Sequence, residues 1–139
     1  MDLDRLMTRN PKFCLATAPL QEVARAMRDK DVGEIPVVDM DRHPIGVITD
    51  RDIVLRTLAA GRNPLDVRAQ DCMTAPPIVI RDDASVEECA RLMERQQVRR
   101  IPVVDAKGAL CGIVALADLE RSDARSLQND VTRSVSQPH

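Results

Sequence analysis

Hydrophobic and polar positions follow two periodicities along this chain, and each periodicity predicts a different element. Apolar residues recur three and four positions apart within residues 19–30 and 85–96, which is typical of amphipathic helices. Further helices are expected to begin near residue 50 and near residue 116. Short runs rich in β-branched residues predict strands at residues 13–16, 35–39, 45–48, 78–80, 101–105 and 110–114. The predicted order is therefore β-α-β-β-α, twice.

An internal repeat accounts for this doubled order. When the sequence is shifted against itself by 66 positions, residues 7–55 align with residues 73–121 without a gap. The identities include the run Ile-Pro-Val-Val-Asp at residues 35–39 and 101–105, Gly46 with Gly112, and Asp52 with Asp118. A fixed period of this kind indicates two copies of one supersecondary unit.

The repeat also sets the expected domain organisation. The predicted fold class is α+β, with a first repeat at residues 1–64 and a second at residues 65–121. Residues 122–139 align with nothing in the first copy and contain few apolar residues. They are expected to form a marginal helix or a disordered tail.

Composition narrows the range of functions. Phe13 is the only aromatic residue, so no aromatic platform exists on which single-stranded bases could stack. The formal net charge of −2 gives no overall attraction to nucleic acids or anionic membranes. No apolar run is long enough for a membrane helix, and the N-terminus lacks the order of a signal peptide. A cytoplasmic protein without nucleic-acid or membrane partners is expected.

The repeated motifs resemble those of a known family. The Ile-Pro-Val-Val-Asp strand and the segment Gly-Val-Ile-Thr-Asp-Arg-Asp at residues 46–52 are similar to motifs of tandem cystathionine-β-synthase (CBS) domains, also called a Bateman module. The resemblance covers roughly residues 3–121 and is greatest to stand-alone pairs. It implies a pseudo-twofold arrangement with two clefts between the repeats. Family members bind AMP, ADP, ATP, NAD or S-adenosylmethionine there and pass the occupancy to a partner.

The resemblance assigns ligand roles to Thr49 and Asp52. A carboxylate at Asp52 would accept hydrogen bonds from both ribose hydroxyls, and the Thr49 hydroxyl would contact the ribose or phosphate. The same two residues also fit a helix N-cap of the T-x-x-D type, which needs no ligand. The two roles are compatible.

The second copy departs from this pattern. Asp118 is retained, but Ala115 stands where the first copy has Thr49. Asp118 is expected either to hold a ribose weakly or to lie in the first turn of a helix. The site built on Asp52 is predicted to be the better one.

Two arginines are implied as phosphate ligands. Arg99 and Arg100 precede the second Ile-Pro-Val-Val strand, where the family places basic residues that reach a phosphate over the opposite repeat. The aligned first-copy residues are Gly33 and Glu34, which are poor phosphate ligands. One cleft is thus predicted to combine Thr49 and Asp52 with the arginines. The alternative is ordinary surface charge.

Aliphatic residues are expected to enclose the base. The predicted set is Ile35, Pro36, Val47, Ile101, Pro102 and Ile113. The alternative, that they are core strand residues, also holds for most of them.

No catalytic or metal site is predicted. Cys14, Cys72, Cys89 and Cys111 lack metal-type spacing, and each aligns with an apolar residue of the other copy, which favours a core role. His43 and His139 lie near no candidate nucleophile.

The sequence therefore predicts a non-catalytic regulatory module that binds an adenosine nucleotide such as AMP, ADP, ATP or NAD. The helix after Asp52 is apolar around much of its circumference, which favours a homodimer through faces that include Ile53, Val54 and Leu58. Burial of that helix within the monomer is the alternative. An effector protein is expected but not identified. A competing function is a structural interaction module with vestigial clefts.

Overall fold

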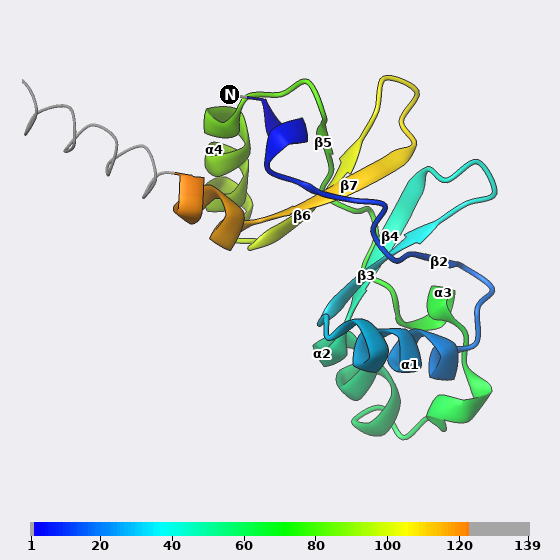
Figure 1. The fold of residues 1–139 in the computed structure, drawn as a ribbon. Coiled ribbons are helices and arrows are strands. Elements are labelled where there is room, and N and C mark those ends of the chain that lie inside the picture. The colour runs from blue at the N-terminus through cyan, green and yellow to red at the C-terminus, as the bar shows by residue number, and fades with distance from the viewer. Residues whose placement is uncertain (1, 123–139) are drawn as a thin grey trace, which may run out of the picture.

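The computed structural model describes residues 2–122. It shows two lobes, one for each repeat (Figure 1). The first lobe contains β2 (Cys14–Leu15), α1 (Leu20–Lys30), β3 (Glu34–Val38), β4 (Pro44–Thr49), α2 (Asp50–Ile53) and the π-helical turn η2 (Val54–Leu58). The second contains β5 (Ile80–Arg81), α4 (Val86–Gln96), β6 (Arg100–Val104), β7 (Leu110–Ala115) and a helix over residues 116–122. The predicted α+β class and the doubled β-α-β-β-α order are confirmed.

Each lobe is built on a small mixed sheet. In the first lobe β2 runs parallel to β3, and β3 runs antiparallel to β4. In the second lobe β5 runs parallel to β6, β6 antiparallel to β7, and a further strand, β1 (Thr8–Arg9), joins the far edge of β7. One face of each sheet is covered by the lobe's long helix.

The two long helices follow the predicted amphipathic pattern. In α1 the residues Leu20, Val23 and Met27 are buried, one turn apart on the same face. In α4 the Ser85 hydroxyl accepts a hydrogen bond from the Glu88 backbone N–H at 3.1 Å, which caps the helix start. Both helices end at a residue in the left-handed region, which closes the last turn.

The segments that precede the repeats are exchanged between the lobes. Leu3 and Met7 are buried in the core of the second lobe, whereas Ala69 and Cys72 of α3 (Ala69–Cys72) are buried in the core of the first. The backbone N–H of Leu3 bonds to the carbonyl of Ala84, and that of Ala69 to the aligned carbonyl of Ala18. Figure 1 shows the blue N-terminal segment beside α4 before the chain crosses to β2.

This exchange bears on the predicted domains. The division of the sequence at residues 64 and 65 stays a prediction, but each lobe's core includes a segment that precedes the other repeat. Full burial of a leucine side chain such as Leu3 stabilises a fold by about 1.5–3 kcal/mol. The two lobes are therefore tied together by buried side chains. The short turn η1 (Leu3–Arg5) lies in the N-terminal segment, and η3 (Pro64–Asp66) lies between the two lobes in sequence.

Two glycines permit the crossing segments to approach the sheets. A Cβ atom at Gly46 would lie 2.7 Å from Met73 Sδ and 3.0 Å from the carbonyl oxygen of Thr74. Gly112 bears the same relation to Met7 and Thr8. With no side chain in the way, the backbones of Val47 and Thr74 form two hydrogen bonds, of 2.8 and 3.0 Å. The repeat thus conserves a Met-Thr pair over a glycine in both lobes.

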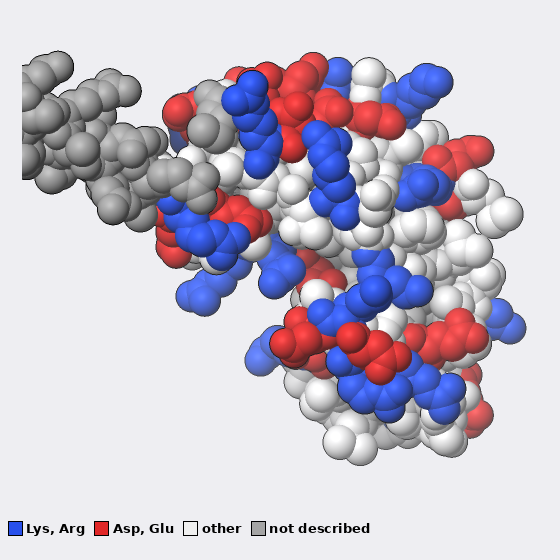
Figure 2. Space-filling view, viewed as in Figure 1, with Lys and Arg blue, Asp and Glu red and all other residues white. Residues whose placement is uncertain are grey.

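The hairpins β3–β4 and β6–β7 meet at their turns. The Leu110 N–H donates to the Arg42 carbonyl at 2.9 Å, and His43 Nε2 lies 3.0 Å from the Lys107 carbonyl oxygen. Figure 2 shows acidic and basic side chains interspersed over both lobes on the face drawn. Within residues 2–122, no helix combines the length and the apolar character required to cross a membrane.

Candidate functional site

Thr49 and Asp52 form the predicted helix cap. The Asp52 N–H donates to Thr49 Oγ1 at 3.0 Å, and the Thr49 N–H donates to Asp52 Oδ2 at 3.0 Å. These reciprocal bonds satisfy two backbone donors where β4 passes into α2. The cap interpretation is therefore confirmed. A ligand contact by the same two residues stays a prediction.

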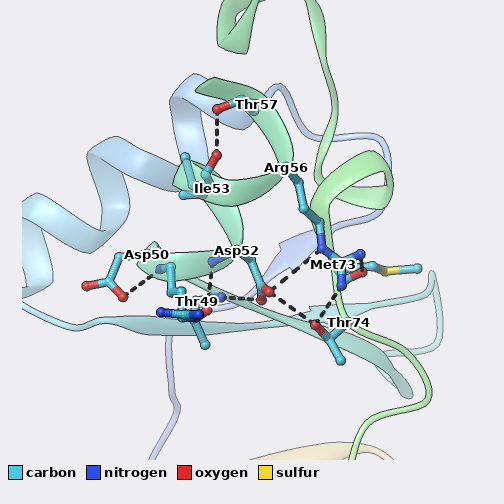
Figure 3. A network of polar contacts seen from close by, with 9 residues as sticks. Thr49, Asp50, Asp52, Ile53, Arg56, Thr57, Met73 and Thr74 are labelled. Atoms are coloured by element: carbon cyan, nitrogen blue, oxygen red, sulfur yellow. Dashed lines mark hydrogen bonds and ion pairs between the residues drawn. The ribbon is translucent and has the colours of Figure 1, made fainter. Parts of the chain in front are cut away.

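The other oxygen of Asp52 faces the segment that crosses from the second lobe. Asp52 Oδ1 accepts a hydrogen bond from the Thr74 hydroxyl at 3.2 Å and lies 3.9 Å from Arg56 Nε (Figure 3). Arg56 also donates to the Met73 carbonyl at 3.0 Å and to Thr74 Oγ1 at 3.4 Å. Both carboxylate oxygens of Asp52 thus already have protein partners. A ribose would have to displace Thr74 or Arg56 to use Oδ1.

Asp118 holds the same place in the second lobe with fewer partners. Its Oδ2 accepts the Ala115 N–H at 2.9 Å, and its Oδ1 pairs with Arg121. The lack of a hydroxyl at Ala115 removes half of the capping box, as the sequence predicts. The Asp118 side chain is 14% exposed, and its partner Arg121 is 69% exposed. The ion pair therefore faces solvent, where such pairs are weak.

A hollow of about 390 Å³ opens beside Asp118, between the two lobes. We call it the Asp118 hollow. Its lining comes from the N-terminal segment, from the end of α1 and start of β3, and from the second lobe: Thr8, Asn10, Pro11, Lys12, Lys30, Val32, Glu34, Arg100, Ile113, Ala115 and Asp118. The structure thus brings Arg100, Ile113 and Asp118 together, three of the residues that the sequence singles out.

Three cations line the Asp118 hollow. They are Lys12, Lys30 and Arg100. By the 66-residue offset, Lys12 aligns with Ile78 and Lys30 with Gln96, so neither aligned position carries a lysine. Charge therefore favours a phosphate near Asp118, where the sequence predicted the poorer site. Both lysines lie outside the repeated motifs, although the repeat alignment could have identified them.

Glu34 is the acidic member of the same lining. It is the first residue of β3 and pairs across the sheet with Thr49. Burial raises the pKa of the Glu34 carboxyl to about 7, while Arg100 lowers the pKa and Asp52 raises it. Near pH 7 the Glu34 carboxyl is therefore protonated in part of the molecules and ionised in the rest.

The CBS-domain family model matches the chain twice, at residues 2–58 and 69–124. The chain is a member of the CBS-domain family. Together with the two lobes, this match makes it a tandem CBS pair, as its motifs indicate.

Similar proteins include one from Bacillus subtilis and two of known structure. The uncharacterized protein YlbB of Bacillus subtilis is 44% identical over 119 residues, which cover 85% of this chain and 79% of YlbB. A crystal structure of Hypoxic Response Protein I with two coordinated zinc ions has a TM-score of 0.80 at 33% identity, covering 87% of this chain and 98% of that one. A crystal structure of CBSX2, an Arabidopsis thaliana protein, in complex with AMP has a TM-score of 0.78 at 26% identity, covering 89% and 97%.

The two predicted arginines of this CBS pair differ in the hollows that they line. Arg100 lines the Asp118 hollow, and Arg99 lines an outer depression with residues of α4. Both arginines line a further depression, with Leu116 and Glu120. Arg100 is the first residue of β6, and Arg99 immediately precedes this strand. The predicted cleft of Thr49, Asp52, Arg99 and Arg100 stays a prediction.

The predicted base walls are chiefly core residues. Ile35, Pro36, Ile101 and Pro102 are buried, and Val47 is half-buried at the edge that Thr74 covers. Ile113 alone of this set lines the Asp118 hollow. It is therefore the predicted apolar contact that this hollow can offer to a base.

The cysteines pack as the repeat predicts. Cys72 and Cys89 are buried in the two cores, and Cys14 and Cys111 pack partly buried against them. Burial raises the pKa of Cys14 and of Cys89 to about 11, which leaves both as unreactive thiols at neutral pH.

One group of metal-ligand type occurs in the described part of the chain. Asp39, Asp41 and His43 bring ligand atoms within 4.8 Å of one another at the β3–β4 turn. Asp39 Oδ1 accepts the backbone N–H groups of Asp41 and His43, both at 2.9 Å. These contacts give the group a turn-forming role, which requires no metal.

Proposed function

We propose that this CBS pair is a non-catalytic regulatory module that binds an adenosine-containing nucleotide in the Asp118 hollow. The observation that carries the proposal is the convergence of a carboxylate, three cations and an apolar wall in one hollow between the lobes. The AMP complex of the structurally similar CBSX2 supports an adenosine ligand. AMP, ADP, ATP and NAD all offer a ribose diol and phosphate, so each is a candidate.

Each part of such a ligand has a chemical counterpart. The Asp118 carboxylate accepts hydrogen bonds, and two vicinal hydroxyls are suitable donors. Arg121 must then yield Oδ1, which its exposed position permits. Lys12, Lys30 and Arg100 supply charge-assisted donors for phosphate oxygens. Ile113 provides apolar contact for the base.

The Asp52 side is the weaker site in this proposal. The Thr74 hydroxyl and Arg56 hold the oxygen that a ribose would use, and the aligned lysine positions are Ile78 and Gln96. This ranking is the reverse of the one predicted from the Thr49–Asp52 motif. The reason is that a motif in one repeat does not reveal which charges the other elements bring beside it.

Isothermal titration of AMP, ADP, ATP and NAD into wild type, Asp118→Asn and Asp52→Asn tests the assignment. Losing a charge-assisted hydrogen bond costs about 1.5–3 kcal/mol, so Asp118→Asn should weaken binding roughly tenfold to a hundredfold. Asp52→Asn is the matched control and should change affinity less than about threefold, on the order of 0.6 kcal/mol. A strong loss of affinity in Asp52→Asn, with no loss in Asp118→Asn, would mean that the nucleotide binds at the first repeat.

The lysines give an independent check of the phosphate end. Lys12→Ala and Lys30→Ala should each weaken the binding of ATP more than that of adenosine, because adenosine has no phosphate. Each variant should also reduce the salt dependence of ATP binding, because salt screens the attraction between lysine and phosphate. Binding of ATP and adenosine with unchanged ratios in both variants would place the phosphates elsewhere.

We also propose that the module is a homodimer through an apolar surface on η2. Val54, Leu55 and Leu58 are 52%, 45% and 76% exposed, while the predicted contact Ile53 instead packs against the first core. The aligned residues for Val54 and Leu55 are Glu120 and Arg121, so the apolar surface is confined to the first repeat. A symmetric dimer would join the first repeat of one protomer to the first repeat of its partner. The dimer contact, or a partner protein bound at this surface, would respond to whether the nucleotide is bound.

A further inference from the structure

Glu34 and Arg100 occupy matched places at the centre of the pair. Each is the first residue of its strand, in β3 and β6, and the 66-residue offset aligns one with the other. Both line the Asp118 hollow. The pseudo-twofold relation thus sets a carboxyl against a guanidinium at the position where a phosphate ligand is expected.

The Glu34 carboxyl is incompletely satisfied. Its Oε2 is buried and has no hydrogen-bond partner among the residues that the structure describes. Buried polar atoms without partners are uncommon because desolvation then goes uncompensated. The charged groups around Glu34 are Arg100 from β6 and Asp52 from α2, with Lys12, Lys30 and Asp118 in the shared lining. The cations attract a carboxylate, and burial and the aspartates disfavour one.

The two protonation states of Glu34 act oppositely on a phosphate. An ionised Glu34 repels phosphate oxygens and competes with them for Arg100. A neutral Glu34 leaves Arg100 free and adds an O–H donor that a phosphate oxygen can accept. The ligand then supplies the partner that Oε2 lacks.

We propose that Glu34 takes up one proton from solvent when a phosphate-bearing nucleotide enters the Asp118 hollow, so that Glu34 makes this site selective for phosphate at slightly acidic pH. The inference rests on the proposed function, because it concerns the same hollow. No bond other than that to the proton is made or broken. The raised pKa of Glu34 is in keeping with this role, since little free energy is needed to protonate the group near pH 7.

The test is the affinity for AMP between pH 6 and pH 8 in wild type, Glu34→Gln and Glu87→Gln. Glu87 lies exposed on α4 and provides the same chemical change away from the hollow. The wild-type Kd should rise with pH by up to roughly tenfold over this interval, as expected for required protonation of a group with a pKa near 7. Glu87→Gln should match wild type, while Glu34→Gln should stay tight at pH 8. The AMP phosphate itself titrates near pH 6, so the comparison is the ratio between variants at each pH.

Proton uptake gives a direct readout. Titrations at pH 7.5 in two buffers of different ionisation enthalpy should report uptake of a fraction of a proton per AMP in wild type, and less in Glu34→Gln. Identical pH dependence in the two proteins would overturn the inference and leave nucleotide binding intact. Tighter wild-type binding at high pH would also overturn it, because Glu34 would then act as an acceptor. No AMP binding at any pH would reject the proposed function and the inference together. Thermal melts establish that Glu34→Gln is folded.

Discussion

The Thr74 hydroxyl donates a hydrogen bond to Asp52 Oδ1 at 3.2 Å, across a separation of 22 residues and from a different element. Thr74 belongs to the segment that crosses between the lobes, and Asp52 belongs to the first helical turn after β4. The contact ties the carboxylate of the repeated motif to the inter-lobe connection. The position of the Asp52 carboxylate and the position of this connection are therefore coupled.

Replacing Thr74 by valine should lower stability modestly. The substitution keeps the shape of the side chain but removes the donor, and a net loss of about 0.5–1.5 kcal/mol is expected for one such hydrogen bond. Urea unfolding followed by circular dichroism measures the change. Thr8→Val, at the aligned exposed position in the N-terminal segment, is the matched control and should have a smaller effect. A larger loss in Thr8→Val would contradict a stabilising role for the Thr74–Asp52 contact.

Gly46→Ala should destabilise the fold because the new methyl group has no room. It would meet Met73 Sδ at 2.7 Å and the Thr74 carbonyl oxygen at 3.0 Å. Overpacking of this kind typically costs about 1–3 kcal/mol. Thermal melts of Gly46→Ala, Met73→Ala and the double variant check the mechanism. Removal of the Met73 side chain should make the double variant more stable than additivity predicts. Strict additivity would mean that the two sites do not interact.

Glu34 should make the protein less stable as pH rises. Its pKa is about 7 in the folded protein against an ordinary value of 4.5, so the folded state binds more protons between these values. The stabilisation is fully present below pH 4.5 and is lost as pH rises through 7. The total is up to about 3 kcal/mol, less whatever solvent at the hollow screens.

Chemical denaturation at pH 5, 6, 7 and 8 measures this linkage, and Glu34→Gln should flatten the profile. Asp39 and Asp105 do not interfere in this range. Backbone N–H bonds, chiefly those from His43 and Ala109, lower their pKa values below 3.8, so their stabilisation is lost only in stronger acid. A wild-type profile that rises from pH 5 to pH 8, or one that Glu34→Gln leaves unchanged, would refute the assignment.

Leu58→Glu should disrupt the proposed homodimer. Leu58 is 76% exposed on η2, so a charge there should leave the monomer fold intact while opposing apolar association. Sedimentation equilibrium should show a monomer for Leu58→Glu. The control is Met40→Glu, at an 85% exposed apolar residue of the β3–β4 turn, and it should remain dimeric. A monomeric wild-type protein would remove the homodimer proposal.

Local pattern was enough to predict the elements of each repeat. The helices within residues 19–30 and 85–96 became α1 and α4, because apolar side chains three and four positions apart form one buried face. The Thr49–Asp52 cap was likewise predictable, since its bonds close within four residues. The strand β1 was missed. Its two residues are exposed and carry no alternation, and they become a strand only by pairing with β7.

The candidate site was predicted less completely than the elements. Asp118, Arg100 and Ile113 were identified from motifs, and the Asp118 hollow brings them together. Lys12 and Lys30 were missed because they lie outside the motifs. Their relevance arises only where the N-terminal segment and the end of α1 meet the second lobe.

The amino-acid sequence by itself determined the duplication, the element order and the α+β class, because helix and strand periodicities and a fixed 66-residue offset are properties of the chain. Only the tertiary structure decided which charges share a hollow. The crossing segments place Lys12 in the hollow lined by Asp118 and Thr74 against Asp52, so the two aligned motifs end in unlike surroundings. The physical reason is that charge and hydrogen bonding act through space between groups far apart in the chain, whereas sequence patterns report mainly neighbours.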